Sequence, residues 1–436
     1  MVNDSFRSRP YAPHKGRSHH RAAPAAGLRV AIYSHDTMGM GHKRRNLLIA
    51  QSLVRQVPHC SVLLITGMVE GNAENLPPGV DYLALPAWHK TTEGEYRPRR
   101  LDLSQQELAQ LRGQIIRAAL DNFNPDVFLV DNVPRGALRE LDGVLEFLKK
   151  QPQTRCVLGL RDILDDPAVV RRQWRKAGNE TAVRRYFDAI WIYGDPAVYD
   201  PVAAYRWPAD IAAKVRYVGY LDGRQRLTAS PPLALAKPRP GRIAPAPDRP
   251  LALCLVGGGQ DGTAVATAFA QATLPEGWQG VLVAGPLMPQ TSRQQVHRYA
   301  ASRPELTVLD YCPEPTWLLN RAAAVVAMGG YNTTCEVLAF GTRALIVPRV
   351  KPRREQWIRA ERLRQMGLVD LLHPDHIGPA VLTQWLAGGR PPEVMGRGSD
   401  RPGRIDLLGL ERLPHLLAEV VAEPRSGGRS PLAAAV

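Results

Sequence analysis

The segment Met328-Gly329-Gly330-Tyr331-Asn332-Thr333-Thr334-Cys335-Glu336-Val337-Leu338-Ala339-Phe340-Gly341 decides the fold class of this 436-residue chain. It directly follows the apolar run Ala322–Ala327, which is typical of a buried strand, and it continues into a short helical pattern. The two glycines allow a close turn between strand and helix. The start of a helix leaves backbone N–H groups without partners and carries the positive end of the helix dipole, so this turn favours a phosphate group.

Glu336 lies three residues after Thr333, one turn into the expected helix. A carboxylate at that position can reach the hydroxyl groups of a ribose whose phosphate binds at the helix start. A phosphate site beside a sugar-binding acid indicates a nucleotide. The alternative is a capping box, Thr333-x-x-Glu336, in which the glutamate serves only to begin the helix. The two roles are compatible, so both stay open at this point.

The composition is that of a globular protein without a membrane span. Hydrophobic residues make up 44% of the chain, and no apolar run approaches the roughly 18 residues that a membrane-spanning helix needs. The first 27 residues are basic, but the apolar segment of a signal peptide does not follow them. Five cysteines are scattered without a CxxC pair, which favours reduced thiols over disulfides or a zinc site. These features predict a cytoplasmic protein.

The chain is strongly basic, with 56 Lys and Arg residues against 41 Asp and Glu residues and a net charge of +15. Such a surface favours anionic partners, including nucleotide phosphates, nucleic acid and an anionic membrane face. The sequence has no helix-turn-helix, zinc knuckle or aromatic platform motif, so sequence-specific nucleic-acid binding is not expected. Peripheral contact with the inner face of the membrane is kept as a hypothesis.

Short apolar runs alternate with amphipathic stretches, which is typical of parallel sheets with crossover helices. One break interrupts the alternation at 222–250, where seven prolines predict a linker. We therefore expect an α/β protein with two doubly wound, Rossmann-like domains that face a cleft. The predicted division is a disordered basic tail at 1–27, a first domain at 28–221, the linker at 222–250, a second domain at 251–422 and a disordered tail at 423–436.

The predicted elements follow this alternation in both halves. Strands are expected at Leu28–Tyr33, Ser61–Thr66, Val80–Leu83, Val127–Val130, Arg155–Leu160, Ala189–Tyr193, Val215–Val218, Leu251–Val256, Val281–Ala284, Leu306–Leu309, Ala323–Ala327 and Ala344–Val347. Helices are expected at Gly41–Gln56, Gln105–Phe123, Ala137–Lys149, Gly262–Ala270, Gln290–Ala301, Thr333–Phe340, Arg354–Met366 and Leu407–Val421. In sheets of this kind a ligand lies outside the carboxyl ends of the strands.

A glycine-rich loop, Gly257-Gly258-Gly259-Gln260-Asp261-Gly262, follows the strand Leu251–Val256. It matches the GxGxxG fingerprint of dinucleotide-binding proteins. That fingerprint also requires an acidic residue at the end of the second strand, and the sequence there is Val283-Ala284-Gly285-Pro286. NAD is therefore not expected. A loop that contacts a diphosphate or its sugar through Gly258, Gly259 and Gln260 remains, with a plain tight turn as the alternative.

The first half carries a corresponding loop, Ser34-His35-Asp36-Thr37-Met38-Gly39-Met40-Gly41-His42. Gly39 and Gly41 allow the loop to lie close to a bound molecule. His42 stands at the start of the next helix, where the helix dipole favours the neutral imidazole that can accept a proton. His42 is the first candidate for a general base, and a cap on that helix is the alternative.

Further polar residues end other strands. Asp131, Arg161 and Asp162 follow strands of the first half, where a carboxylate can act as a base and an arginine can bind an acceptor. Glu355 and Gln356 follow the strand Ala344–Val347 and are candidates for contacts with sugar hydroxyls. The chain has no Walker motif, no HExxH and no strand-end Asp-x-Asp that would carry a divalent ion on a diphosphate. A metal is therefore not expected.

Together these residues resemble glycosyltransferases of the GT-B fold, and in particular family 28, the group that includes the enzyme forming lipid II. The resemblance is most specific in Gly330-Tyr331-Asn332-Thr333-Thr334-Cys335-Glu336, followed by Gly341, Pro348, Arg354-Glu355-Gln356 and Ala360 in the family's order and near its spacing. Val256-Gly257-Gly258-Gly259-Gln260 resembles the family's second glycine loop, and Gly41-His42 its Gly-His turn. The general pattern covers nearly 28–420.

The resemblance implies a nucleotide-sugar site in the second domain and an acceptor site in the first. Donor binding is implied for Gly258, Gly259, Gln260, Tyr311, Cys312, Gly330, Asn332, Thr333, Thr334, Glu336, Glu355 and Gln356. Acceptor-side contacts are implied for Gly39, Gly41 and Arg161, and His42 is the expected base with Asp131 or Asp162 as alternatives. The family has a pair of glutamines where this chain has Glu355-Gln356, which leaves the donor sugar open.

The expected reaction is transfer of a hexosyl group from a nucleotide diphosphate sugar, with UDP as the expected carrier. By the resemblance it inverts the anomeric carbon, and it needs neither a cofactor nor a metal. The acceptor is an unidentified hydroxyl compound, with a lipid-linked acceptor kept as a hypothesis. Two other readings stay open: a nucleotide-sugar hydrolase or 2-epimerase on the same scaffold, and a non-catalytic nucleotide-binding protein.

Overall fold

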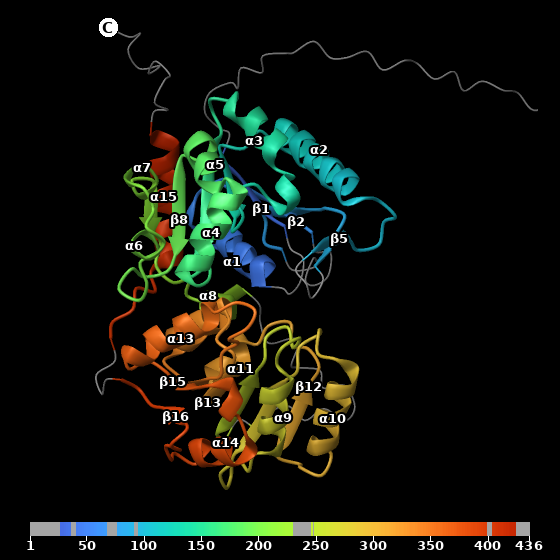
Figure 1. Cartoon of the computed structure of the whole chain (residues 1–436), viewed down its shortest axis with the longest axis vertical. Coiled ribbons are helices and arrows are strands. Elements are labelled where there is room, and N and C mark those ends of the chain that lie inside the picture. The colour runs from blue at the N-terminus through green and yellow to red at the C-terminus, as the bar shows by residue number, and fades with distance from the viewer. Residues whose placement is uncertain are drawn as a thin grey trace, which may run out of the picture.

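The structure, a computed structural model, describes residues 27–35, 41–67, 76–90, 95–229, 246, 248–398 and 403–423. Of the two predicted tails, only Gly27 and Glu423 are among these residues. Gly39 and most of the predicted linker lie outside them. Figure 1 shows two α/β lobes stacked along the long axis of the molecule. The first lobe carries most of the N-terminal half, and the second carries most of the C-terminal half.

The first lobe is built on a seven-stranded sheet in the order β3-β2-β1-β6-β7-β8-β9, with every neighbouring pair parallel. Its central strands are buried on both faces, which is why they read as continuous apolar runs in the sequence. The strands are β1 (Arg29–Ser34), β2 (Ser61–Thr66), β3 (Val80–Ala84), β6 (Val127–Asp131), β7 (Arg155–Arg161), β8 (Ala189–Tyr193) and β9 (Val215–Tyr217). A small hairpin of β4 (Trp88–Lys90) and β5 (Tyr96–Pro98) stands apart from this sheet.

The helices of the first lobe cover both faces of this sheet. They are α1 (Gly41–Gln56), α2 (Gln105–Phe123), η2 (Ala137–Arg139), α3 (Asp142–Lys149), α4 (Pro167–Ala177), α5 (Asn179–Tyr186), α6 (Pro201–Tyr205), α7 (Ala209–Ala212) and α8 (Gln225–Ala229). The predicted single helix over Ala137–Lys149 is wrong at its start. Leu138 and Arg139 have φ angles of 49° and 63°, and a left-handed backbone cannot continue a right-handed helix.

The second lobe is also built on a seven-stranded sheet with helices. Its sheet has the order β12-β11-β10-β13-β14-β15-β16, in which only β16 pairs antiparallel among the described strands. The strands are β10 (Leu251–Leu255), β11 (Gln279–Val283), β12 (Leu306–Leu309), β13 (Ala322–Ala327), β14 (Arg343–Ile346), β15 (Asp370–Leu372) and β16 (Val394–Met395). The helices are α9 (Thr263–Gln271), α10 (Gln290–Ala300), α11 (Thr316–Arg321), α12 (Tyr331–Phe340), α13 (Glu355–Gln365), η4 (Pro374–His376), α14 (Pro379–Leu386) and α15 (Gly409–Ala422).

Each sheet has one point where the strand order reverses, between β1 and β6 in the first lobe and between β10 and β13 in the second. At such a switch point the loops leave neighbouring strands in opposite directions and open a crevice at their carboxyl ends. The loop before His42 follows β1, and the glycine loop at 257–262 follows β10. The predicted site residues therefore concentrate at both switch points.

Helix α15 belongs in space to the first lobe, although the sequence division placed 251–422 in one domain. It packs against α1, and the Ser52 hydroxyl donates a hydrogen bond to the Leu410 carbonyl at 3.1 Å. In Figure 1 this helix, drawn in red, lies beside the first lobe. The start of the predicted linker is also structured, because α8 at Gln225–Ala229 packs against α11 of the second lobe.

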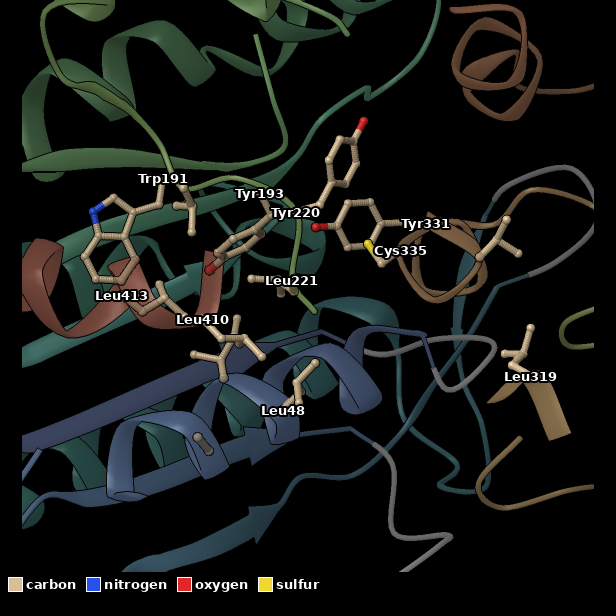
Figure 2. Packing of buried hydrophobic residues seen from close by; sticks show 14 of the residues in the cluster. Leu48, Trp191, Tyr193, Tyr220, Leu221, Leu319, Tyr331, Cys335, Leu410 and Leu413 are labelled. Atoms are coloured by element: carbon tan, nitrogen blue, oxygen red, sulfur yellow. The ribbon is translucent and has the colours of Figure 1, made fainter. Parts of the chain in front are cut away.

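The two lobes share an apolar cluster. Figure 2 shows Tyr220 of the first lobe beside Tyr331 of α12, and their rings stack with centroids 6.2 Å apart. Leu48 of α1 and Leu410 and Leu413 of α15 belong to the same cluster. Within the part of the chain that the structure describes, no helix is long and apolar enough to cross a membrane.

Candidate active site

A cavity of about 470 Å³ lies between the lobes, where the two switch points face each other. Its first-lobe lining is Gly41, His42, Arg44, Arg45 and Arg161. Its second-lobe lining is Leu255, Gly257, Gly258, Val283, Gly285, Pro286, Leu287, Tyr311, Cys312, Pro315, Gly330, Tyr331, Asn332 and Thr333. The structure thus brings about half of the predicted site residues together at one cavity: Gly41, His42, Arg161, Gly258, Tyr311, Cys312, Gly330, Asn332 and Thr333.

The start of α12 forms one wall of this cavity. Gly330 is the N-cap and gives the helix no side-chain cap, so the first N–H groups of the helix are available to a ligand. Gly329 has φ of 72°, a backbone conformation that favours glycine. Thr333 faces the cavity, whereas Thr334 is buried and its N–H bonds to the Gly330 carbonyl. This geometry is that of an anion site at a helix N-terminus.

The helix starts at Tyr331 rather than at Thr333. Thr333 is therefore inside the first turn and cannot be the N-cap of a capping box with Glu336, so that alternative is wrong. Tyr311 and Cys312 follow β12 and line the cavity beside the helix start. Asn332 also lines it, and its amide donates a hydrogen bond across the lobes to the Gly41 carbonyl at 3.0 Å.

The glycine loop after β10 forms a second wall. Gly257 and Gly258 line the cavity, whereas Gly259 and Gln260 do not. Gly259 has φ of 88°, and a Cβ there would lie 2.2 Å from the Ala284 carbonyl oxygen. This glycine is needed for close packing of two backbone loops, which supports the tight-turn alternative at this one position. The neighbouring Gly258 carbonyl accepts a hydrogen bond from the Leu287 N–H at 2.8 Å.

Glu336 lies behind the cavity wall and is fully buried. Its carboxylate accepts hydrogen bonds from Arg44 at 3.0 Å and from Arg226 at 2.7 Å, both from the first lobe. The Thr316 hydroxyl lies 3.2 Å away, and Oε2 has no hydrogen-bond partner. Arg44 also pairs with Glu314. Both arginines contact Oε1 of Glu336, and the residue does not line the cavity.

Glu355 and Gln356, at the start of α13, hold the preceding turn together. Gln356 accepts a hydrogen bond from the Arg349 N–H at 2.9 Å, and Glu355 pairs with the Arg349 guanidinium at 2.8 Å. Burial opposes ionisation of Glu355, but Arg161 and Arg349 outweigh it and lower the pKa of that carboxyl. Neither side chain lines the cavity, so their predicted contact with a sugar requires a shift of this turn.

His42 and Asp131 form a dyad on the first-lobe side. The imidazole Nδ1 lies 2.7 Å from the Asp131 carboxylate, which ends β6 and is 1% exposed. Arg45 donates to the other oxygen of Asp131 at 2.5 Å, and the Asn46 amide donates at 3.3 Å. Burial would raise the pKa of Asp131, but Arg45 and His42 outweigh it and hold the pKa well below its usual range.

These contacts fix the tautomer of the imidazole. An ionised carboxylate only accepts hydrogen bonds, so the contact with Asp131 requires a proton on Nδ1 of His42. Arg45 Nη2 also lies 3.0 Å from Nδ1, but a guanidinium only donates and a protonated Nδ1 cannot accept, so this contact is not a hydrogen bond in that tautomer. The neutral imidazole then has Nε2 as its acceptor. His42 lines the cavity with 21% of its side chain exposed.

Asp162 is differently placed from the other candidate bases. It is fully buried and accepts two hydrogen bonds from Arg359 of α13, at 2.6 and 2.8 Å, and one from the Tyr220 hydroxyl at 2.9 Å. The bonds from Arg359 join the two lobes, whereas the bond from Tyr220 lies within the first lobe, and Asp162 does not line the cavity. The geometry therefore favours a structural role over that of a base.

Three charged or aromatic lining residues were not predicted from the sequence: Arg44, Arg45 and Tyr331. The two arginines are on the first turn of α1, immediately after His42, and that position beside a candidate base was the available signal. Arg45 lies over the rings of Tyr193 and Tyr331, with its guanidinium carbon 5.8 and 5.5 Å from the centroids. It therefore connects α1 to both lobes.

Comparisons with known proteins support the architecture. Neither the protein-family models nor the curated proteins gave a match. Among solved structures, the glycosyltransferase VinC in complex with dTDP has a TM-score of 0.55 at 16% identity, covering 90% of this chain and 99% of VinC. A provisionally assigned UDP-N-acetylglucosamine 2-epimerase from Listeria monocytogenes has a TM-score of 0.55 at 14% identity, covering 93% and 99%. MurG from Acinetobacter baumannii has a TM-score of 0.50 at 13% identity, covering 90% and 99%.

At these identities the likeness is one of fold. The chain has the GT-B architecture, with two Rossmann-like domains facing a cleft, as the sequence predicted. The neighbours include both glycosyltransferases and a protein assigned as an epimerase. The activity of this chain must therefore be argued from its own residues.

Proposed function

We propose that this protein is a glycosyltransferase that moves a hexosyl group from a nucleotide diphosphate sugar, with UDP as the carrier, to a hydroxyl acceptor. One observation carries the proposal: His42, which is hydrogen-bonded to Asp131, and the uncapped N-terminus of α12 line one cavity from different lobes. The first supplies a base, and the second supplies a site for a leaving diphosphate. A sugar between them would lie between nucleophile and leaving group.

The proposed reaction is a direct displacement at the anomeric carbon. Nε2 of His42 takes the proton from the acceptor hydroxyl, whose oxygen forms the new bond to the anomeric carbon. The bond from that carbon to the diphosphate oxygen breaks, and the electron pair leaves with the diphosphate. The N–H groups at the start of α12 and the backbone of Gly257 and Gly258 stabilise the developing charge.

Asp131 is proposed to orient His42 rather than to take the proton itself. Its two oxygens are already held by Arg45, Asn46 and His42, and its lowered pKa makes it a poor base. An ionised aspartate behind the imidazole keeps the proton on Nδ1 and stabilises the imidazolium that forms during the reaction. Asp131 is therefore a positioning residue in this proposal.

The donor nucleotide is proposed to bind in the second lobe. Tyr311 and Cys312 would contact the base, Thr333 and the helix start the diphosphate, and Glu336 the ribose after release of Arg44. The test is to incubate the purified protein with UDP-glucose, UDP-N-acetylglucosamine and a dTDP-sugar, each with and without a pool of cellular small molecules. Acceptor-dependent release of free nucleotide, lost in His42→Ala and kept in His415→Ala, supports the proposal; His415 is an exposed residue of α15.

The competing functions give different results in the same assay. Consumption of the donor without any acceptor would overturn the transferase and favour a hydrolase. Conversion of the donor into its epimer would favour a 2-epimerase, the activity assigned to one structural neighbour. Tight UDP binding with no donor consumed in any acceptor pool would leave a nucleotide-binding protein.

A further inference from the structure

The cavity has three arginines in its lining, and two of them are paired with carboxylates. Arg44 forms ion pairs with Glu314 and Glu336, and Arg45 forms one with Asp131. Their charges are therefore compensated within the protein. The third is Arg161, the last residue of β7.

Arg161 has no such partner in the described part of the chain. Its guanidinium takes part in no ion pair or side-chain hydrogen bond there, and its Nε is buried without a hydrogen-bond partner. Nε is also unpartnered in Arg44 and Arg45, but their outer nitrogens contact carboxylates. Asp162, the next residue along the chain, is fully engaged with Arg359, so it does not neutralise Arg161.

The surroundings of Arg161 add positive charge. Burial lowers the pKa of its guanidinium, Glu355 opposes that shift, and Arg45, Arg359 and Arg353 add to it, so that the pKa comes to about 10. With that pKa the side chain is still charged at neutral pH. Among the described residues no carboxylate forms an ion pair with Arg161, and around it three arginines stand against the single carboxylate of Glu355, so the site favours an anion that enters the cavity.

We propose that Arg161 binds an anionic group, phosphate or carboxylate, of the acceptor. This inference rests on the proposed transferase function and names the class of its acceptor. Arg161 comes from the same sheet edge as Asp131, since β7 pairs with β6, and it shares the cavity with His42. The donor diphosphate has its own site at α12. The acceptor therefore presents its hydroxyl to His42 and its anion to the planar fork of Arg161, which suits a bidentate contact.

The test uses inorganic phosphate as the probe, with acetate as a separate carboxylate arm. Each is titrated by calorimetry into the full-length protein saturated with UDP, so that the helix N-terminus is already filled. We expect phosphate or acetate to bind the wild type. We expect the affinity of Arg161→Gln for the same anion to be lower by about tenfold or more. Arg161→Lys keeps the charge but loses the fork and should fall between the two. Arg172→Gln removes an exposed arginine of α4 and should bind like the wild type.

Several results would overturn the proposal. Equal phosphate and acetate affinity in the wild type and Arg161→Gln would do so, as would no binding of either anion to the wild type. Weaker UDP binding in Arg161→Gln, with anion binding unchanged, would assign this arginine to the donor. The proposed transferase function is tested separately, because it fails if UDP itself does not bind. In that case the difference in anion affinity between the wild type and Arg161→Gln still decides whether Arg161 binds an anion. Melting curves of both variants confirm that they are folded.

Discussion

The buried ion pair between Asp162 and Arg359 is expected to be the strongest single polar contact between the lobes. Replacing Asp162 by Leu leaves Arg359, which is 1% exposed, with the Gly329 carbonyl at 3.2 Å as its remaining hydrogen-bond acceptor among the described residues. Two hydrogen bonds to a charged group are lost, at about 1.5–3 kcal/mol each. Removing one partner of a buried pair costs about 3–5 kcal/mol. We therefore expect the free energy of unfolding to fall by about 4 kcal/mol.

The measurement is urea unfolding followed by tryptophan fluorescence, with the free energy taken from the first transition. The matched control is Asp210→Ala, which removes an ion pair with Arg184 whose side chains are 40% and 54% exposed. An exposed pair of this kind contributes about 0–1 kcal/mol. The double variant Asp162→Leu with Arg359→Met removes both charges, and we expect it to lie within about 2 kcal/mol of the wild type.

The reasoning is refuted if the single variant loses less than about 1 kcal/mol, or if the double variant is no more stable than the single ones. The same proteins also address catalysis. If the double variant folds and still consumes donor, Asp162 is not the base. If it folds but is inactive while His42→Ala stays active, the roles proposed for these two residues must be exchanged.

Three further predictions concern the cavity. His42→Ala should lower kcat by about 10²–10⁴-fold without changing UDP affinity by calorimetry; a variant as active as the wild type would exclude it as the base. Because the pKa of Asp131 is lowered, its stabilising effect is complete above the unfolded pKa of about 3.9 and is lost as the pH falls toward the folded value. The melting temperature of the wild type should therefore exceed that of Asp131→Asn most above pH 5 and by less at pH 3, and a constant difference would contradict the lowered pKa. Glu336→Gln should weaken UDP binding about fivefold or more if the carboxylate accepts ribose hydroxyls, whereas unchanged affinity would leave Glu336 as an interlobe contact only.

Much of the fold could be predicted because its signals are local. The helix Gln105–Phe123 agrees with the structure at both ends, since Ser104 and Glu107 form a capping box and Asn124 ends the helix in a left-handed conformation. Twelve of the fourteen strands in the two sheets were predicted as buried apolar runs, with bounds that differ by at most two residues, whereas the short strands β15 and β16 were not predicted. Two of the loops at the switch points followed directly from those strands.

The remaining features depend on contacts between distant parts of the chain. Glu336 pairs with Arg44, which is 292 positions away in the sequence, and with Arg226, which is 110 positions away. No local sequence pattern predicts these pairs. Arg226 lies in a segment whose prolines begin only a few residues later, so the whole stretch read as a linker. The sequence therefore predicted a site role for Glu336 but not the arginines that contact its carboxylate.

Because α15 packs on the first lobe, that lobe can be completed only after the second half of the chain has been synthesised. The face of α1 that α15 covers, including Leu48 and Ser52, stays open on the nascent chain until α15 has been synthesised and has left the ribosome. Synthesis of the intervening second half takes on the order of ten seconds or more at about 5–20 residues per second. We expect the first lobe to wait in an incomplete state during that time, so a truncated product that ends in the second half would be a substrate for chaperones and proteases.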